Sequence, residues 1–145
     1  MRSNAPFERQ AITIETMIGI LLIMHAPLGQ AFMATATHMF SGKLERVEVI
    51  DVIADQEPYE VHKQARQAIE RLDDGSGVLV LTDVLGGTPS NCCHTLFTDS
   101  HVEVIAGGSL PMLLRALTYR DSDLETVVEK ALTGGKSGAV RVDHC

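Results

Sequence analysis

The sequence predicts an α/β domain with an open, doubly wound parallel sheet in the order 2-1-3-4 and helices on both of its faces. Short apolar stretches alternate with longer helical patterns, and the connections between them are short. Residues 18–24 and 78–81 are continuous apolar runs, which is typical of central parallel strands covered on both faces. Residues 47–52 and 102–106 partly alternate, which favours strands nearer an edge. The crossovers between parallel strands should be right-handed.

Length and composition limit the classes of protein to which the chain can belong. The 145 residues suit one domain, expected over residues 17–145. Residues 1–16 show no strong period and lack the apolar core of a signal peptide, so they are expected to be a leader or disordered extension. Aromatic residues make up only 4%, so the core must be aliphatic. The net charge of -7 argues against nucleic acid or an anionic membrane as the main partner.

For the first half of the chain, the sequence predicts the order strand, helix, strand, helix. After the strand at 18–24, apolar positions at helical spacing predict a helix that ends before Gly42. After the strand at 47–52, a second helical pattern ends at the turn over residues 73–77. The inward faces are predicted to be Leu28, Ala31, Phe32, Thr35 and Met39 in the first helix, and Val61, Ala65, Ala68, Ile69 and Leu72 in the second.

The second half continues the alternation. The strand at 78–81 leads through a glycine turn to a helix expected to begin at Pro89, with Thr88 as its N-cap. The strand at 102–106 is followed by a turn and a helix over about residues 111–117. A last helix runs near residues 124–132 and is expected to end at Gly134 and Gly135. Residues 137–142 are predicted to form a fifth short strand.

The cysteines give no disulfide framework. They are Cys92, Cys93 and Cys145, an odd number with two neighbours in sequence, which favours a reducing cytosol. Cysteine and histidine are common metal ligands, so the run of Cys92, Cys93 and His94 is a candidate metal-binding site. Adjacent positions on a helix diverge by about 100 degrees, however, so they cannot chelate one ion as a C-x-x-C pair does. A structural role is favoured, and no metal is expected.

Two loops carry the candidate chemistry. His25 follows the first strand, and Asp83 follows the third. Strands one and three are neighbours in a 2-1-3-4 sheet, and the chain leaves them toward opposite faces. A crevice opens at this switch point, and both residues should lie at its rim. A carboxylate beside a histidine can accept a hydrogen bond from one ring nitrogen, which leaves the other nitrogen as a nucleophile.

The loop after Asp83 offers a cradle for an anion. Gly86 and Gly87 would present backbone N–H groups, and Thr88 adds a hydroxyl. A helix N-terminus at Pro89 would add a partial positive charge. Together these groups can hold an oxyanion or a phosphoryl group without a metal.

These residues resemble the mannose-family IIA components of the bacterial phosphoenolpyruvate-dependent sugar phosphotransferase system. The resemblance rests on residues 18–25 followed by 28–31, on residues 78–91, and on residues 104–113. It covers about residues 17–142, and the block from Asp83 to Asn91 is its most specific part.

The resemblance implies a cytoplasmic phosphohistidine carrier without a cofactor. His25 would accept a phosphoryl group on Nε2 from the histidine-containing phosphocarrier protein. It would pass the group to a IIB component for sugar uptake and phosphorylation, so that the membrane is involved only through transporter components. Asp83 matches the residue that holds the other ring nitrogen. Thr88, with Gly86, Gly87 and Ser90, would bind the phosphoryl group.

The resemblance also implies an assembly, and the chain departs from the family pattern at one position. Members commonly form homodimers by exchanging a C-terminal strand, here about residues 138–142. Many members carry Thr or Ser before the histidine, whereas this chain has Met24. No IIB domain follows, so a free-standing IIA protein is expected.

Other functions stay open at this point. One is a regulatory phosphoacceptor without a cognate transporter, and another is the phosphoryl-donor subunit of dihydroxyacetone kinase. A more distant alternative is a small-molecule or metal-binding module that uses Cys92, His94 and His25.

Overall fold

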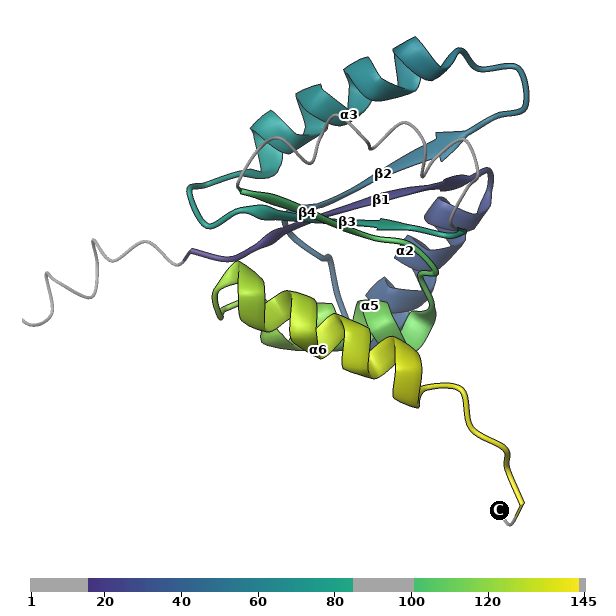
Figure 1. The fold of residues 1–145 in the computed structure, drawn as a ribbon, viewed down its shortest axis with the longest axis vertical. Helices are drawn as coiled ribbons and strands as arrows, with labels where there is room; N and C mark the ends of the chain where they lie inside the picture. Colours follow the sequence, from purple (N-terminus) through teal and green to yellow (C-terminus); the bar gives the residue numbers. More distant parts are fainter. Residues whose placement is uncertain (1–15, 85–100, 144–145) are drawn as a thin grey trace, which may run out of the picture.

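The computed structural model describes residues 16–84 and 101–143, and within them four parallel strands form one sheet (Figure 1). The strand order is β2-β1-β3-β4, which confirms the predicted sheet. The strands are β1 (Gly19–His25), β2 (Val47–Val52), β3 (Val78–Thr82) and β4 (Val102–Ile105). The partly alternating stretches at 47–52 and 102–105 are the two edge strands, as their pattern predicted.

Strand β1 lies at the centre and is buried on both faces. It pairs in parallel with β2, where Ile20 lies opposite Val47, and with β3, where Ile20 lies opposite Leu79. Successive side chains of a strand point to opposite faces, so a continuous apolar run supplies both cores. Leu21 and Ile23 join one apolar cluster. Ile20, Leu22 and Met24 join the other.

Helices cover both faces of the sheet (Figure 1). Helix α3 (Pro58–Leu72) packs on one face, while α2 (Leu28–Met39), α5 (Leu110–Tyr119) and α6 (Leu124–Ser137) pack on the other. No helix in the described part of the chain is long and apolar enough to cross a membrane. The helix predicted to begin at Pro89 lies outside the described residues.

Helix α3 buries the face that its periodicity predicts. Its buried residues are Val61, Ala65, Ala68, Ile69 and Leu72. Pro58 occupies the first helical position, where a backbone N–H has no partner within the helix. Helices α5 and α6 begin at side-chain caps, because Ser109 Oγ accepts from the Met112 N–H at 3.3 Å and Asp123 Oδ1 accepts from the Thr126 N–H at 2.9 Å.

The predicted inward face of α2 is correct only in part, because Phe32 packs against the core but other members of that face do not. The helix buries Gly29 and Ala36, whereas Leu28 is 37% exposed and Met39 is 54% exposed. The physical reason is the closeness of α2 to strand β2. A Cβ atom on Gly29 would collide with the ends of the Asp51 and Val49 side chains, so a larger residue would require both to move. A small residue is therefore favoured where α2 lies closest to β2.

The predicted end of the last helix is also wrong. Gly134 and Gly135 lie inside α6, which continues to Ser137. A Cβ atom on Gly134 would lie 2.9 Å from the Pro111 backbone oxygen, so this glycine permits a close approach of α5 and α6. Residues 139–143 form no strand within this single chain, which corrects the predicted fifth strand. Exchange of that segment between two copies stays a prediction.

The close approach of α5 and α6 gives a stability prediction. Gly134→Ala should lower the free energy of unfolding by about 1–2 kcal/mol, because overpacking costs about 1–3 kcal/mol and better helix propensity offsets at most about 1 kcal/mol. Gly135→Ala is the matched control, since its new Cβ would meet only the movable end of Met112 at 2.7 Å. Urea unfolding of both variants measures the difference. A Gly134→Ala protein as stable as the control would contradict the packing argument.

Candidate functional site

His25 is the residue at which the buried central strand reaches the surface. The six preceding residues of β1 are buried, and His25, the last residue of the strand, has a side chain that is 51% exposed. It lies opposite Val52, the last residue of β2. The ring therefore sits at the carboxyl edge of the sheet, where parallel strands of α/β proteins place their functional groups.

Asp83 meets His25 at this edge through two different atoms of the histidine. Asp83 Oδ2 accepts a hydrogen bond from the His25 backbone N–H at 2.9 Å and lies 2.9 Å from His25 Nδ1. Its other oxygen, Oδ1, accepts from the Val84 N–H at 2.9 Å. The structure thus brings together the two residues that the sequence singled out. It also adds the backbone contact, for which the sequence offers no signal.

The hydrogen bonds keep Asp83 ionised. Burial by itself would raise the pKa of this carboxyl, whose side chain is only 10% exposed. Three hydrogen bonds outweigh this effect, namely those from the His25 backbone N–H, the His25 ring and the Val84 N–H. Together with the electrostatic attraction to His25, they hold the pKa of Asp83 below its usual range. The stabilisation from this lowered pKa is present at neutral pH and is lost as the pH falls through the lowered value.

An ionised Asp83 determines which ring nitrogen of His25 is reactive. A carboxylate can only accept hydrogen bonds, so the neutral ring must carry its proton on Nδ1. Nε2 is then left with a free lone pair on a half-exposed ring. A positive charge that forms on the ring would also be stabilised by the adjacent carboxylate. This arrangement suits a nucleophile that receives a group on Nε2.

A second carboxylate orders the turn that follows His25. Pro27 precedes α2 and gives it no side-chain cap. Asp51 of β2 supplies the cap instead, because Oδ1 accepts from the Gly29 N–H at 2.8 Å and Oδ2 from the Gln30 N–H at 3.1 Å. Asp51 was not among the residues predicted from the sequence to form the site. The available signal was a charged residue near the end of an otherwise apolar strand, combined with a helix start that lacks a capping residue.

Met24 lies in the core and not beside the reactive nitrogen. Its side chain is fully buried in the apolar cluster under α5 and α6. Neighbouring residues on a strand point to opposite faces, so Met24 and His25 point in different directions. The missing hydroxyl at this position is thus replaced by a packing side chain.

Several predicted residues lie outside the described part of the chain. They are Gly86, Gly87, Thr88 and Ser90 of the proposed anion cradle, and Cys92 and His94 of the metal alternative. Within residues 16–84 and 101–143, no group of three or more His, Cys, Asp or Glu side chains is placed to hold a metal ion.

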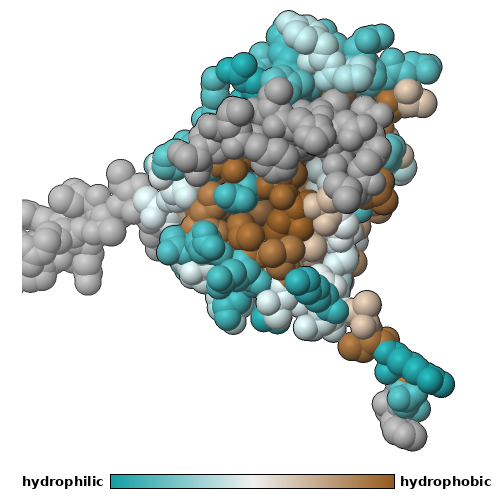
Figure 2. All heavy atoms as spheres, in the orientation of Figure 1, coloured by the Kyte–Doolittle hydropathy of each residue, from teal (hydrophilic) through white to brown (hydrophobic). Residues whose placement is uncertain are grey.

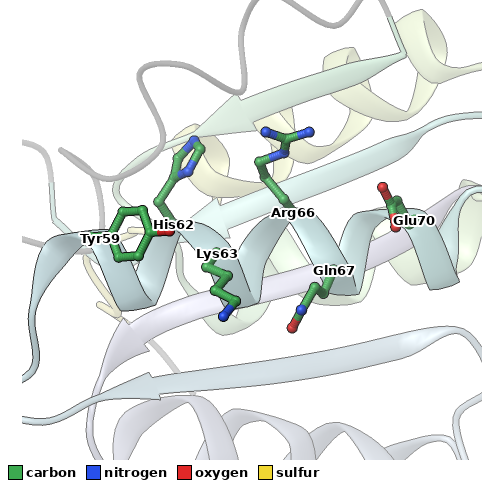
Figure 3. Close-up of a pocket in the computed structure, with 6 residues that line it drawn as sticks. All are labelled: Tyr59, His62, Lys63, Arg66, Gln67 and Glu70. Carbon is green, nitrogen blue, oxygen red and sulfur yellow. The ribbon is translucent and has the colours of Figure 1, made fainter.

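A hollow of about 340 Å³ runs along α3 (Figure 3). Tyr59, His62, Lys63, Arg66, Gln67 and Glu70 line it. These side chains come from one helix and carry mixed charges. They share no residue with the His25–Asp83 pair, which remains the candidate site.

Comparison with known proteins shows the family to which the chain is similar. Residues 19–132 match the family described as PTS system fructose IIA component. The chain is 32% identical over 124 residues to the PTS system mannose-specific EIIAB component of Escherichia coli K12, and the match covers 83% of this chain and 38% of that protein. It is 24% identical over 106 residues to the PTS system fructose-specific EIIA component of Bacillus subtilis 168, covering 72% of each.

Solved structures show the same fold. A phosphotransferase system component EIIA from Streptococcus agalactiae has a TM-score of 0.77 and 28% identity, covering 86% of this chain and 97% of that one. A mannose/sorbose specific IIA subunit from Enterococcus faecalis has a TM-score of 0.78 at 20% identity, with coverage of 90% and 98%, and shows the likeness of fold.

The chain spans only 38% of the length of the mannose-specific EIIAB protein, so the match concerns one part of that protein. The family match, by contrast, extends from the first residue of β1 into α6 and includes both His25 and Asp83. On this evidence, the chain belongs to the fructose/mannose IIA component family of the sugar phosphotransferase system.

Proposed function

We propose that this protein is a cytoplasmic phosphohistidine carrier that accepts a phosphoryl group on His25 Nε2. The donor would be the histidine-containing phosphocarrier protein, and the acceptor a IIB component that serves sugar uptake. The observation that carries the proposal is the 2.9 Å contact between Asp83 Oδ2 and His25 Nδ1 on a half-exposed ring. The mannose-specific and fructose-specific names of the relatives support a role in sugar transfer.

The transfer step needs only the two proteins. The Nε2 lone pair of His25 forms a bond to phosphorus while the N–P bond to the donor histidine breaks, and that electron pair stays on the donor ring. His25 keeps its proton on Nδ1 and becomes cationic, and the donor ring, cationic while phosphorylated, becomes neutral. Asp83 stabilises the new charge, and the reverse sequence passes the group to the acceptor. Positioning and electrostatics supply most of the catalysis in such a transfer.

The phosphoryl oxygens need donors, which we assign to the segment after Asp83. Gly86, Gly87, Thr88 and Ser90 would supply backbone N–H groups and hydroxyls. Support comes from the position of Asp83, which contacts His25 and, through Val84, leads into this segment. A glycine-rich turn followed by a helix start is a common anion site.

We also propose that the protein forms a homodimer through the face that presents β4 and α6. Among the described residues, strand β4 pairs with β3 alone and is an edge strand. Figure 2 shows an apolar area on this face. On α6, Leu124 and Val128 are only partly buried and Leu132 is 37% exposed. In the segment after α6, Val140 is 71% exposed and Val142 is 66% exposed. Apolar side chains and an open strand edge suit an added strand from a second copy.

The carrier proposal predicts a single phosphorylated residue. Incubation with phosphoenolpyruvate, enzyme I and the phosphocarrier protein should give one acid-labile phosphate per chain, and His25→Ala should gain none because the nucleophile is missing. Intact-mass spectrometry at alkaline pH measures the gain. His38→Ala, a change at an exposed histidine of α2, is the matched control and should behave as the wild type. Equal phosphate on His25→Ala would disprove the assignment.

The geometry also predicts the effect of neutralising Asp83. Asp83→Asn should slow phosphorylation by roughly 10²–10⁴-fold, because an amide can donate to Nδ1 and so favour the tautomer whose proton blocks Nε2. Quenched-flow kinetics measure the rate, and ¹⁵N chemical shifts of the ring report the tautomer. Asp55→Asn removes the same charge from an exposed loop position and should leave the rate within about twofold. An Asp83→Asn protein with normal kinetics would exclude the orienting role.

The dimer proposal predicts that a charge on the apolar face weakens association. Leu132→Glu should raise the dimer dissociation constant by at least roughly tenfold, because the new carboxylate would be buried without a partner. Sedimentation equilibrium distinguishes the 15.7 kDa chain from a pair. Gln67→Glu adds the same charge on exposed α3 and should not affect association. A wild-type protein that is monomeric at high micromolar concentration would refute the proposal.

A further inference from the structure

The helix that follows His25 begins close to it in the sequence. Helix α2 starts at Leu28, three residues after the ring. The free N–H groups and the partial positive charge at a helix N-terminus make it a common binding site for phosphate. A phosphoryl group on His25 could therefore be stabilised by α2 itself.

In this protein, a carboxylate already occupies that helix end. Asp51 Oδ1 accepts from the Gly29 N–H at 2.8 Å, and Oδ2 accepts from the Gln30 N–H at 3.1 Å. The Ala31 N–H donates to the Pro27 carbonyl at 3.1 Å. Three successive N–H groups in the first turn of α2 are thus already paired, two of them with a negative charge.

Two further observations show that this arrangement is built into the chain. Asp51 lies opposite Met24 in the register of β1 and β2, one position before the pair of His25 and Val52, so it is held by the sheet and not by a loop. Gly29 leaves the room that the carboxylate needs, because a Cβ atom there would lie 2.4 Å from Asp51 Oδ1. Residues of two separate elements are needed to bring the carboxylate to the helix end.

We propose that Asp51 is a positioning residue that closes the N-terminus of α2 to the phosphoryl group and thereby keeps phosphorylated His25 reactive. The inference rests on the proposed carrier function. A carrier must release its phosphoryl group as readily as it accepts it. Each additional charge-assisted hydrogen bond to the phosphoryl oxygens would stabilise the phosphorylated state and slow onward transfer. Asp51 withholds two such donors from the phosphoryl group.

The first test uses the wild-type protein. After phosphorylation of His25, the Gly29 and Gln30 amide protons should show no coupling to phosphorus across a hydrogen bond and no large downfield shift in the NMR spectrum. A phosphorus coupling at either amide would overturn the inference. This readout needs no variant, so it remains decisive if a substitution prevents folding.

The second test is Asp51→Asn with Asp55→Asn as the matched control for charge. Asparagine can accept from only one of the two amides, so one N–H is released toward the phosphoryl group. The equilibrium between the phosphorylated donor protein and His25 should move roughly three- to tenfold toward phosphorylated Asp51→Asn, and transfer to an acceptor should slow accordingly. Asp55→Asn should stay within about twofold of the wild type. Mixing with limiting donor and resolving both phosphoproteins by mass gives the equilibrium constant.

The outcomes separate this inference from the carrier proposal. If Asp51 were only a structural cap, Asp51→Asn would lower the unfolding free energy and leave the phosphoryl equilibrium within twofold of the wild type. That result, or a shift away from the phosphorylated variant, would overturn the inference. If wild-type protein takes no phosphate on His25, the carrier proposal fails and the inference falls with it. If wild type is phosphorylated and only the Asp51→Asn shift is missing, the carrier proposal stands alone.

Discussion

The burial of strand β1 on both faces is the constraint on which the other features depend. A strand of consecutive apolar residues can be buried only if helices pack on both sides of the sheet, and neighbouring strands must satisfy its backbone hydrogen bonds. Parallel pairing with β2 and β3 meets the second condition. His25 is the first residue of this strand to reach solvent. The same packing and pairing that bury the strand therefore fix the position of the His25 backbone.

The two strands that flank β1 each contribute a carboxylate near its end. Asp83, after β3, contacts both the backbone and the ring of His25. Asp51, near the end of β2, contacts the first turn of α2. Both carboxylates accept hydrogen bonds from backbone N–H groups of the same short segment, and they come from the strands on either side of β1. Because each carboxylate is carried by a strand paired with β1, the sheet register determines how the segment from His25 to Gln30 is oriented.

Two differences between the predicted and observed helices have one cause. Apolar periodicity alone selected Leu28 and Met39 for the inner face of α2, and it treated Gly134 and Gly135 as the end of α6. In the structure, Gly29 and Gly134 lie where another element approaches closely, and a side chain would collide with Asp51 or with the Pro111 carbonyl. Periodicity counts apolar side chains and contains no information on the distance between elements.

Local patterns predict the strands, their central and edge positions, the order of the sheet and the pairing of His25 with Asp83. These patterns are continuous apolar runs, alternation, and polar residues placed after strands one and three. Three features are visible only in the folded chain, namely the hydrogen bond from the His25 backbone to Asp83, the cap that Asp51 provides to α2, and the glycine contacts of α2 and α6. Each of these depends on distances of a few ångströms between residues far apart in sequence. Such distances are set by how the helices and strands pack together, and no single element encodes them.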